Sequence, residues 1–374
     1  MHKKNKVKIG LIFTLDYEIH GNGSGEFKNW AFLPTSQMLD LFDEYGAKLT
    51  IMAEMGHYWA MKRYSDLFLD DILLFESQLI NAIKRGHDVQ FHFHPQWINS
   101  KYEEGEWKLD FSQKTIGKLC HQYDEAFFYL KKGKTELQNL LTPINSGYKC
   151  ICFRAGFLQM QPYETIQKAL VDAGFESDSS VSKGMKAENS LISIDYTSAY
   201  SRYLPWKTSK LNVGQRDDNG EILEFPILSD NIGFIEKAFR KVIVMKGEKS
   251  IGNVIAGLMD IYGRGMMPKN NPTTFLNRIE RLISLKWFYV DFCKEDHANL
   301  NKYLKKVVSD CNKKNYSGYV PVVLIGHSKD FFFNNNLSMF LQSCMNIEGL
   351  EFITYSKAVN KFKYENHEKS FYPG

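Results

Sequence analysis

The chain has 374 residues, of which 44% are hydrophobic and 24% are charged. These fractions are close to those of ordinary folded domains, which argues against a disordered, collagen-like or charged-tail protein. With 47 Lys and Arg against 43 Asp and Glu, the net charge is only +4, so no nucleic-acid partner and no anionic membrane surface is indicated.

Strand-like and helix-like segments alternate over the first two thirds of the chain, which is typical of βα units around a parallel sheet. A nearly continuous apolar run predicts a strand buried on both faces at Val7–Leu15. The further strands expected in this part are Lys48–Ala53, Asp88–Phe93, Lys149–Phe153 and Phe175–Ser177. The helices expected between them are Thr35–Tyr45, Ser65–Arg85, Ser112–Lys132 and Pro162 to about Ala173.

The later part of the chain departs from this repeat. Residues 179–220 are rich in polar residues and Gly and are predicted to be an insertion that faces the substrate. A strand is expected at Glu221–Ile227, and residues 231–318 are predicted to be a second elaboration. Its helical patterns are Asn231–Met245, Ile251–Tyr262, Thr274–Leu285 and His297–Asn312. The last predicted elements are strand Tyr319–Ile325, helix Leu337–Cys344 and strand Leu350–Thr354. No break in composition divides the chain, so we predict one decorated α/β barrel domain over residues 1–374.

Targeting and redox signals are weak. No apolar run approaches the ~18–20 residues of a transmembrane helix, and the first one leads directly into Asp16 and Glu18, so neither a membrane span nor a signal peptide is expected. The six cysteines show no C-x-x-C spacing, which argues against a disulfide scaffold or a structural zinc site. These features predict a cytoplasmic protein, and they leave peripheral attachment to a membrane assembly and an oligomeric state open.

Polar residues are concentrated where four predicted strands end. In an α/β barrel the carboxyl ends of the strands surround the active site, so polar residues there carry more weight than elsewhere. The four segments are Thr14–Glu18, His92–Trp97, Phe153–Phe157 and Gly326–Asp330.

A metal site is predicted from two of these segments. His92 and His94 stand two apart on an extended segment, so both imidazoles project to one face, and Asp16 and Glu18 share a face for the same reason. The predicted ligand set is therefore Asp16, Glu18, His92 and His94. Imidazoles with carboxylates suit Zn²⁺ or another divalent first-row ion, whose bound water becomes more acidic. Histidines that are merely hydrogen-bonded at the barrel mouth are the alternative.

Arg154 and His327 are the other candidate catalytic residues. The planar guanidinium of Arg154 suits a carboxylate or a substrate, and a structural ion pair is the alternative. His327 is a candidate general acid, because an imidazole titrates near neutral pH, or else a hydrogen-bonded structural residue. Glu54 ends the second strand, where structural pairing is the favoured interpretation. No G-x-S-x-G segment indicates a serine esterase.

Three residues are predicted to bind substrate. Trp97 and Phe157 follow strand ends, where an aromatic face can stack on a sugar ring, although core packing explains most aromatic residues. Lys329, which follows the strand predicted at Tyr319–Ile325, is the third predicted substrate-binding residue.

Six short segments, in this order, resemble the successive motifs of the NodB-homology polysaccharide deacetylases, carbohydrate esterase family 4. They are Thr14–Glu18, Gly86–Pro95, Phe153–Gly156, Asp178–Val181, Glu224–Pro226 and His327–Lys329, and the match spans about residues 7–332. The resemblance implies a distorted (β/α)₇, TIM-like barrel with helical insertions. It also implies metal-dependent hydrolysis of an N- or O-acetyl group on a sugar, polysaccharide or glycoconjugate precursor.

By the same resemblance, Asp16 is the general base, Arg154 orients it, His92 and His94 bind the metal, and His327 protonates the leaving group. The chain departs from the family pattern at two points. Tyr17 stands where the family has a metal-binding Asp, with Glu18 as the expected replacement, and the two histidines are two residues apart rather than four. The H-x-H-P-x-W form looks like a subgroup of these proteins. A metal-independent hydrolase of small amides and a non-catalytic saccharide-binding protein remain as alternatives.

Overall fold

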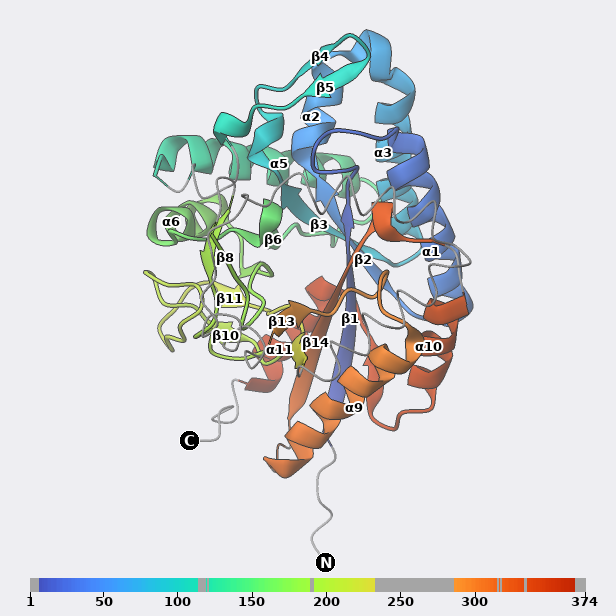
Figure 1. Ribbon diagram of the computed structural model, residues 1–374, viewed down its shortest axis with the longest axis vertical. Coiled ribbons are helices and arrows are strands. Elements are labelled where there is room, and N and C mark those ends of the chain that lie inside the picture. Colours follow the sequence, from blue (N-terminus) through green and yellow to red (C-terminus); the bar gives the residue numbers. More distant parts are fainter. Residues whose placement is uncertain are drawn as a thin grey trace, which may run out of the picture. The chain divides into compact units, whose positions relative to one another are not determined.

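The computed structural model describes residues 7–113, 119, 121–188, 192–232, 286–314, 316, 318–332 and 335–366 (Figure 1). The chain divides into two compact units, residues 1–229 with 289–374 and residues 230–288. Around the second unit the structure describes two strands that pair with each other, β12 (Ser229–Ile232) and β13 (Lys286–Tyr289). The helix predicted at Asn231–Met245 is wrong at its start, because Asn231 and Ile232 belong to β12, and the rest of it lies outside the described residues. The helices predicted at Ile251–Tyr262 and Thr274–Leu285 also lie outside the described residues.

The first unit is built on a nine-stranded sheet in the order β10-β11-β7-β6-β3-β2-β1-β14, with β15 also paired to β1. All neighbours run parallel except β10, which pairs antiparallel with β11. The strands are β1 (Lys8–Tyr17), β2 (Leu49–Glu54), β3 (Asp88–Phe93), β6 (Cys152–Ala155), β7 (Ser177–Asp178), β10 (Trp206–Lys207), β11 (Leu223–Glu224), β14 (Tyr319–His327) and β15 (Leu350–Phe352). Two small hairpins stand apart from this sheet, β4 (Lys101–Glu103) with β5 (Glu106–Lys108) and β8 (Lys186–Glu188) with β9 (Ser193–Asp195).

The far edge of the parallel sheet meets β14 through single bridges. Beyond β11, Ile227 bridges Val323 in parallel, and the Leu228 amide donates to the Val323 carbonyl at 2.8 Å. Asp291 forms a second parallel bridge with Ile325. The sheet is thus a distorted TIM-like barrel, as predicted, whose closing edge holds bridges instead of a full ladder.

Helices cover the sheet (Figure 1). They are α1 (Leu33–Glu44), α2 (Met55–Arg63), α3 (Ser65–Lys84), α5 (Tyr123–Leu141), α6 (Glu164–Ala173), α9 (His297–Lys313), α10 (Asn335–Met345) and α11 (Tyr355–Asn366). The sequence predicts neither α2 nor α11 and ends α5 too early, at Lys132. The reason is Gly133, which suggests a stop but lies inside α5, where a Cβ would overlap the Phe91 ring, so the glycine lets the helix approach β3 closely. None of the described helices has the length and apolarity that a membrane span needs.

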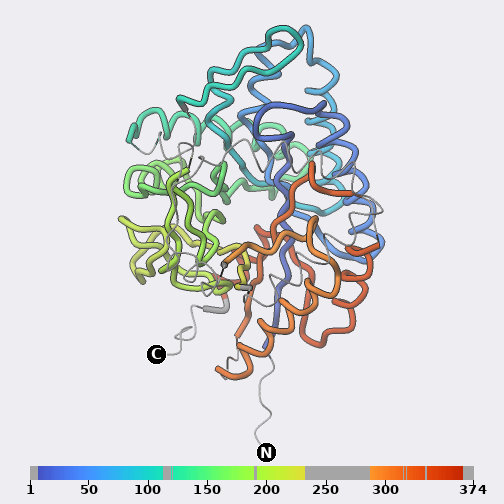
Figure 2. The backbone as a smooth tube through the Cα atoms, in the orientation of Figure 1, coloured from blue at the N-terminus to red at the C-terminus, as the bar shows by residue number. Residues whose placement is uncertain are grey.

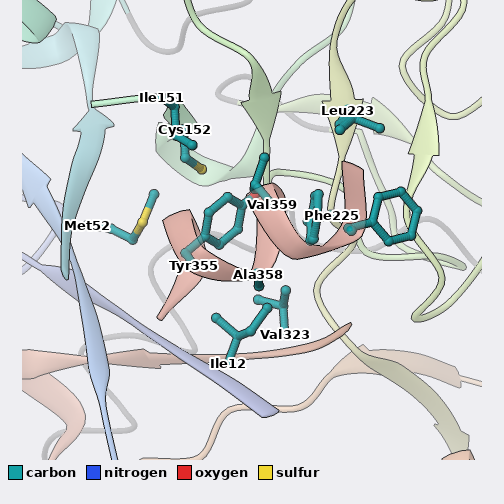
Figure 3. Packing of buried hydrophobic residues seen from close by; sticks show 11 residues of the cluster. Ile12, Met52, Ile151, Cys152, Leu223, Phe225, Val323, Tyr355, Ala358 and Val359 are labelled. Atoms are coloured by element: carbon teal, nitrogen blue, oxygen red, sulfur yellow. The ribbon is translucent and has the colours of Figure 1, made fainter. Parts of the chain in front are cut away.

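One face of helix α11 lies against the barrel (Figure 3), and the other face, with Lys357, Asn360 and Tyr364, is exposed. Its buried face packs against inward side chains of the surrounding strands, and the cluster comprises Ile12, Met52, Ile151, Cys152, Leu223, Phe225, Val323, Tyr355, Ala358, Val359 and Phe362. The Tyr355 amide donates to Thr50 Oγ1 and the Ser356 amide to Asp88 Oδ2, both at 2.9 Å, so polar side chains inside the barrel hold the start of the helix. The polar residues at the carboxyl ends of the strands lie at the opposite end of the barrel.

Strands β1 and β14, far apart in sequence, lie side by side along their length (Figure 2). Their register sets Asp16 directly opposite His327. On the other side, Glu54 stands opposite His92, and His92 opposite Arg154. Because opposed residues of neighbouring strands share a face, the register alone brings these side chains to one end of the barrel.

Candidate active site

Asp16 lies at the centre of the site and uses its two carboxylate oxygens differently. Oδ1 accepts a hydrogen bond from Arg154 Nη1 at 2.7 Å. Oδ2 lies 3.8 Å from both His92 Nε2 and His327 Nε2. Burial would raise the pKa of Asp16, but Arg154, His92 and His327 together hold it below its ordinary value. The result is an ionised, buried carboxylate with one oxygen directed at two imidazoles.

Arg154 is fully buried and locked in place. Its Nε donates to the Ser179 carbonyl at 2.8 Å and its Nη2 to Ser179 Oγ at 3.0 Å, which leaves Nη1 for Asp16. Ser179 belongs to the segment after β7, so this strand end orients the guanidinium. The guanidinium of Arg154 is therefore fixed between Ser179 and Asp16.

His327 is held by a residue that the sequence does not predict. Its Nδ1 lies 2.9 Å from Asp291 Oδ2, while the other Asp291 oxygen accepts the Cys293 amide at 2.9 Å. Donation from Nδ1–H to Asp291 leaves Nε2 facing Asp16. Asp291 follows an apolar run in the sequence, as the other site residues do, and this is the signal that points to it.

Glu18 lies beside His92 and His94 and pairs with Lys329. Its Oε2 lies 3.0 Å from His94 Nε2 and 3.4 Å from His92 Nε2, and its Oε1 pairs with Lys329 Nζ. Burial would raise the pKa of Glu18, but Lys329, His94 and His92 hold it well below its ordinary value. Lys329 is thus the counter-charge of a site carboxylate.

Tyr17 stands outside the site. Because side chains alternate along β1, Asp16 and Glu18 point into the barrel and Tyr17 points out, where its ring stacks on Phe75 and meets Phe27 edge to face. Glu18, two residues after Asp16, therefore lies beside the histidines while Tyr17 does not.

A metal-type cluster forms at this end of the barrel. Ligand atoms of Glu18, Glu54, His92 and His94 all lie within 4.8 Å of one another, and all four residues are buried. Glu54 joins this set although structural pairing is the expectation from the sequence. Asp16 is not among the four and lies 3.8 Å from His92.

The chemistry of the cluster fits a divalent ion. His92 Nδ1 lies 3.0 Å from the Arg154 carbonyl, and donation there leaves Nε2 as the ligand atom. Within the described part of the chain, His92 Nε2 and Glu54 Oε2 are buried without a hydrogen-bond partner, 3.8 Å apart. Burial lowers the pKa of His92, but Asp16, Glu18 and Glu54 outweigh it and raise the pKa to about 9. Two such atoms can share an ion at ~2.0–2.2 Å from each.

The three predicted substrate residues lie in different surroundings. Trp97 is only 3% exposed and packs on His57 and Trp107. Lys329 is paired with Glu18. Phe157 is partly exposed, with its ring centroid 4.8 Å from that of His94.

The backbone at Phe157 is left-handed, with φ of 54°, and so is that of Leu158, with φ of 57°. Side chains rarely adopt this conformation, which costs roughly 1–2 kcal/mol per residue. The fold thus maintains a strained turn that presents the Phe157 ring beside His94.

A scan against models of protein families and a search of curated proteins find no match. Solved structures are similar over nearly the whole chain. A "putative polysaccharide deacetylase" from Mycobacterium smegmatis is 12% identical, with a TM-score of 0.49 over 97% of this chain and 93% of that one. A "probable polysaccharide deacetylase" from Pseudomonas aeruginosa PAO1 is 10% identical, with a TM-score of 0.44 over 99% and 94%. Puue allantoinase is 10% identical, with a TM-score of 0.42 over 100% and 94%. At such values these similarities establish neither the family nor the activity of this chain.

Proposed function

We propose that the chain is a metal-dependent hydrolase that removes an acetyl group from a sugar, polysaccharide or glycoconjugate precursor. One observation supports it above all. Asp16 and His327, each held by a buried counter-charge, face each other at 3.8 Å beside a cluster of ligand atoms. An acid and a base in different environments next to such a cluster are what hydrolysis of an amide or ester requires. The choice of an acetylated sugar rests on the order of the motifs.

The two groups have separate tasks. Asp16, kept ionised by Arg154, accepts a proton from the attacking water through Oδ2. His327, oriented by Asp291, donates a proton from Nε2 to the departing amine or alcohol. A divalent ion held by the cluster would supply Lewis acidity, which makes a coordinated water more acidic and polarises the substrate carbonyl.

Phe157 is the substrate contact that we retain from the sequence. Its partly exposed ring lies beside a cluster histidine, so it can limit the space next to the reacting carbonyl. Lys329 acts on Glu18 instead. The buried ring of Trp97 supports the neighbouring aromatic residues, so we do not include it among the substrate contacts.

The experiment is a release assay for acetate with a panel of N- and O-acetylated sugars, before and after chelation and reloading with divalent ions. We expect turnover that a chelator removes and metal restores. Asp16→Asn should abolish turnover, and His327→Gln should retain the metal and lower kcat by about 10²–10⁴-fold. Asp40→Asn, a change at an exposed residue of α1, is the matched control.

Two outcomes would contradict this function. Hydrolysis of small amides that no chelator affects would favour a metal-independent C–N hydrolase. Saccharide binding that survives Asp16→Asn, without turnover by the wild type, would favour a non-catalytic binding protein.

A further inference from the structure

Glu54 has a double position, at the end of β2 and at the start of α2. As the N-cap of α2, its Oε1 accepts the Gly56 amide at 2.7 Å and the His57 amide at 3.4 Å. The same oxygen also accepts the His94 amide at 3.2 Å. Three backbone donors therefore use one carboxylate oxygen and fix the orientation of the other.

The second oxygen has no such role. Glu54 Oε2 is buried and, among the residues that the structure describes, makes no hydrogen bond. It faces His92 Nε2 across 3.8 Å, and that buried nitrogen also lies 3.4 Å from Glu18 Oε2 without the geometry of a hydrogen bond. The 3.8 Å between Glu54 Oε2 and His92 Nε2 is too long for a hydrogen bond, so a proton on either atom would not create a hydrogen bond between them. A cation between the two atoms would satisfy both, and leaving them unpaired carries the cost of burying bare polar atoms.

Helix capping alone does not account for this arrangement. A capping residue needs one acceptor oxygen, and shorter side chains such as Asp serve that purpose best. The longer Glu54 brings its free oxygen to 3.8 Å from His92 Nε2, and a carboxylate oxygen of Glu54 lies within 4.8 Å of ligand atoms of Glu18, His92 and His94.

We propose that Glu54 is a fourth protein ligand of the metal, and that the ion is one that accepts five or six ligands, such as Mn²⁺, Fe²⁺ or Co²⁺. This inference rests on the proposed function. A catalytic Zn²⁺ site commonly has three protein ligands and one open position for water. Two carboxylates and two imidazoles already fill a tetrahedron, so a hydrolytic water needs a larger coordination number. Carboxylate-rich sites also suit harder ions than thiolate or all-imidazole sites do.

The test uses Co²⁺ as the probe, because its visible absorption is strong in four-coordinate sites and weak at higher coordination. Binding is measured by titration for the wild type, Glu54→Gln, Glu54→Asp and the control Glu136→Gln, whose side chain accepts a hydrogen bond from Trp59 Nε1. Gln keeps the capping acceptor and loses the anionic oxygen. Asp keeps the charge and caps well but is one methylene shorter. We expect weak absorption in the wild type and at least about 10-fold weaker binding by both Glu54 variants, with the control unchanged.

Each contrary outcome is distinct. Wild-type affinity in Glu54→Asp, which caps the helix as well as Glu, would show that Glu54 only caps α2. Strong, four-coordinate absorption in the wild type would overturn the coordination number. If the wild type releases acetate in a metal-dependent way while both Glu54 variants bind Co²⁺ normally, this inference fails and the proposed function stands. If the wild type binds no divalent ion, both are overturned.

Discussion

Gly156→Ala should damage the proposed metal site without altering a proposed ligand. A Cβ at this position would lie 2.6 Å from His94 Cγ, 2.7 Å from His94 Nδ1 and 2.9 Å from the Phe93 carbonyl oxygen. Carbon atoms pack at ~3.5–4.0 Å, so the imidazole has to move by roughly 1 Å. Productive site geometry is held within about 0.5 Å, so the displacement exceeds what a ligand tolerates. The φ of Gly156 is not left-handed, so the effect comes from this contact and not from the backbone.

The assay is competition with a chromophoric chelator for Zn²⁺ and Co²⁺, together with thermal unfolding. We expect roughly 10–100-fold weaker metal binding. Overpacking should also lower the free energy of unfolding by about 1–3 kcal/mol. Gly147→Ala is the control, because its Cβ would meet only Asn145 Oδ1, at 3.4 Å, in an exposed turn. Unchanged affinity in a folded Gly156→Ala protein would refute the assignment of His94 as a ligand.

Three further outcomes are expected. Lys329→Met removes the partner of Glu18 Oε1 and should weaken metal binding about 10-fold by titration, whereas unchanged binding would show that Glu18 needs no counter-charge. Asp291→Asn should lower kcat by about 10²–10⁴-fold with the metal content unchanged, and loss of metal instead would contradict its role beside the acid. Burial lowers the pKa of His87 from 6.5 to about 4, and its Nδ1 accepts the Leu49 amide. The neutral form of His87 therefore contributes its full stabilisation of the folded state above pH 6.5, and this stabilisation is lost as the pH falls toward 4. By linkage, the free energy of unfolding falls by about 2 kcal/mol between pH 6.5 and pH 5. In urea unfolding, His87→Asn should reduce this dependence on pH, and an unchanged dependence would show that another group causes it.

Strands β1, β2, β3, β14 and β15 are predictable because each is a short apolar run, whereas β7 (Ser177–Asp178) and β10 (Trp206–Lys207) are two-residue strands without such a run. Strand β3 has the predicted bounds, Asp88–Phe93. Helix α11 shows its apolar positions at Tyr355, Ala358, Val359 and Phe362, a helical spacing that the sequence offers. What the sequence cannot indicate is that this stripe faces the inside of a barrel, because that depends on five strands meeting around it.

The site, too, is only partly predictable from the sequence. Alternation along β1 and β3 suffices to predict that Asp16, Glu18, His92 and His94 share one end of the barrel, with Tyr17 outside. The two roles that the sequence misses depend on tertiary contacts. Glu54 shows its free oxygen only once α2 is seen to use the other one, and Asp291 becomes relevant only once its segment bridges β14.

Metal content is the measurement that tests the central claim most directly. Protein purified without an affinity metal is compared with the double variant His92→Ala/His94→Ala by elemental analysis, after both are confirmed to be folded. We predict about one equivalent of a divalent first-row ion in the wild type and none in the variant. A folded wild type that holds no ion, even after loading with Zn²⁺, Mn²⁺ and Co²⁺, would contradict the claim that this barrel is a metal-dependent hydrolase.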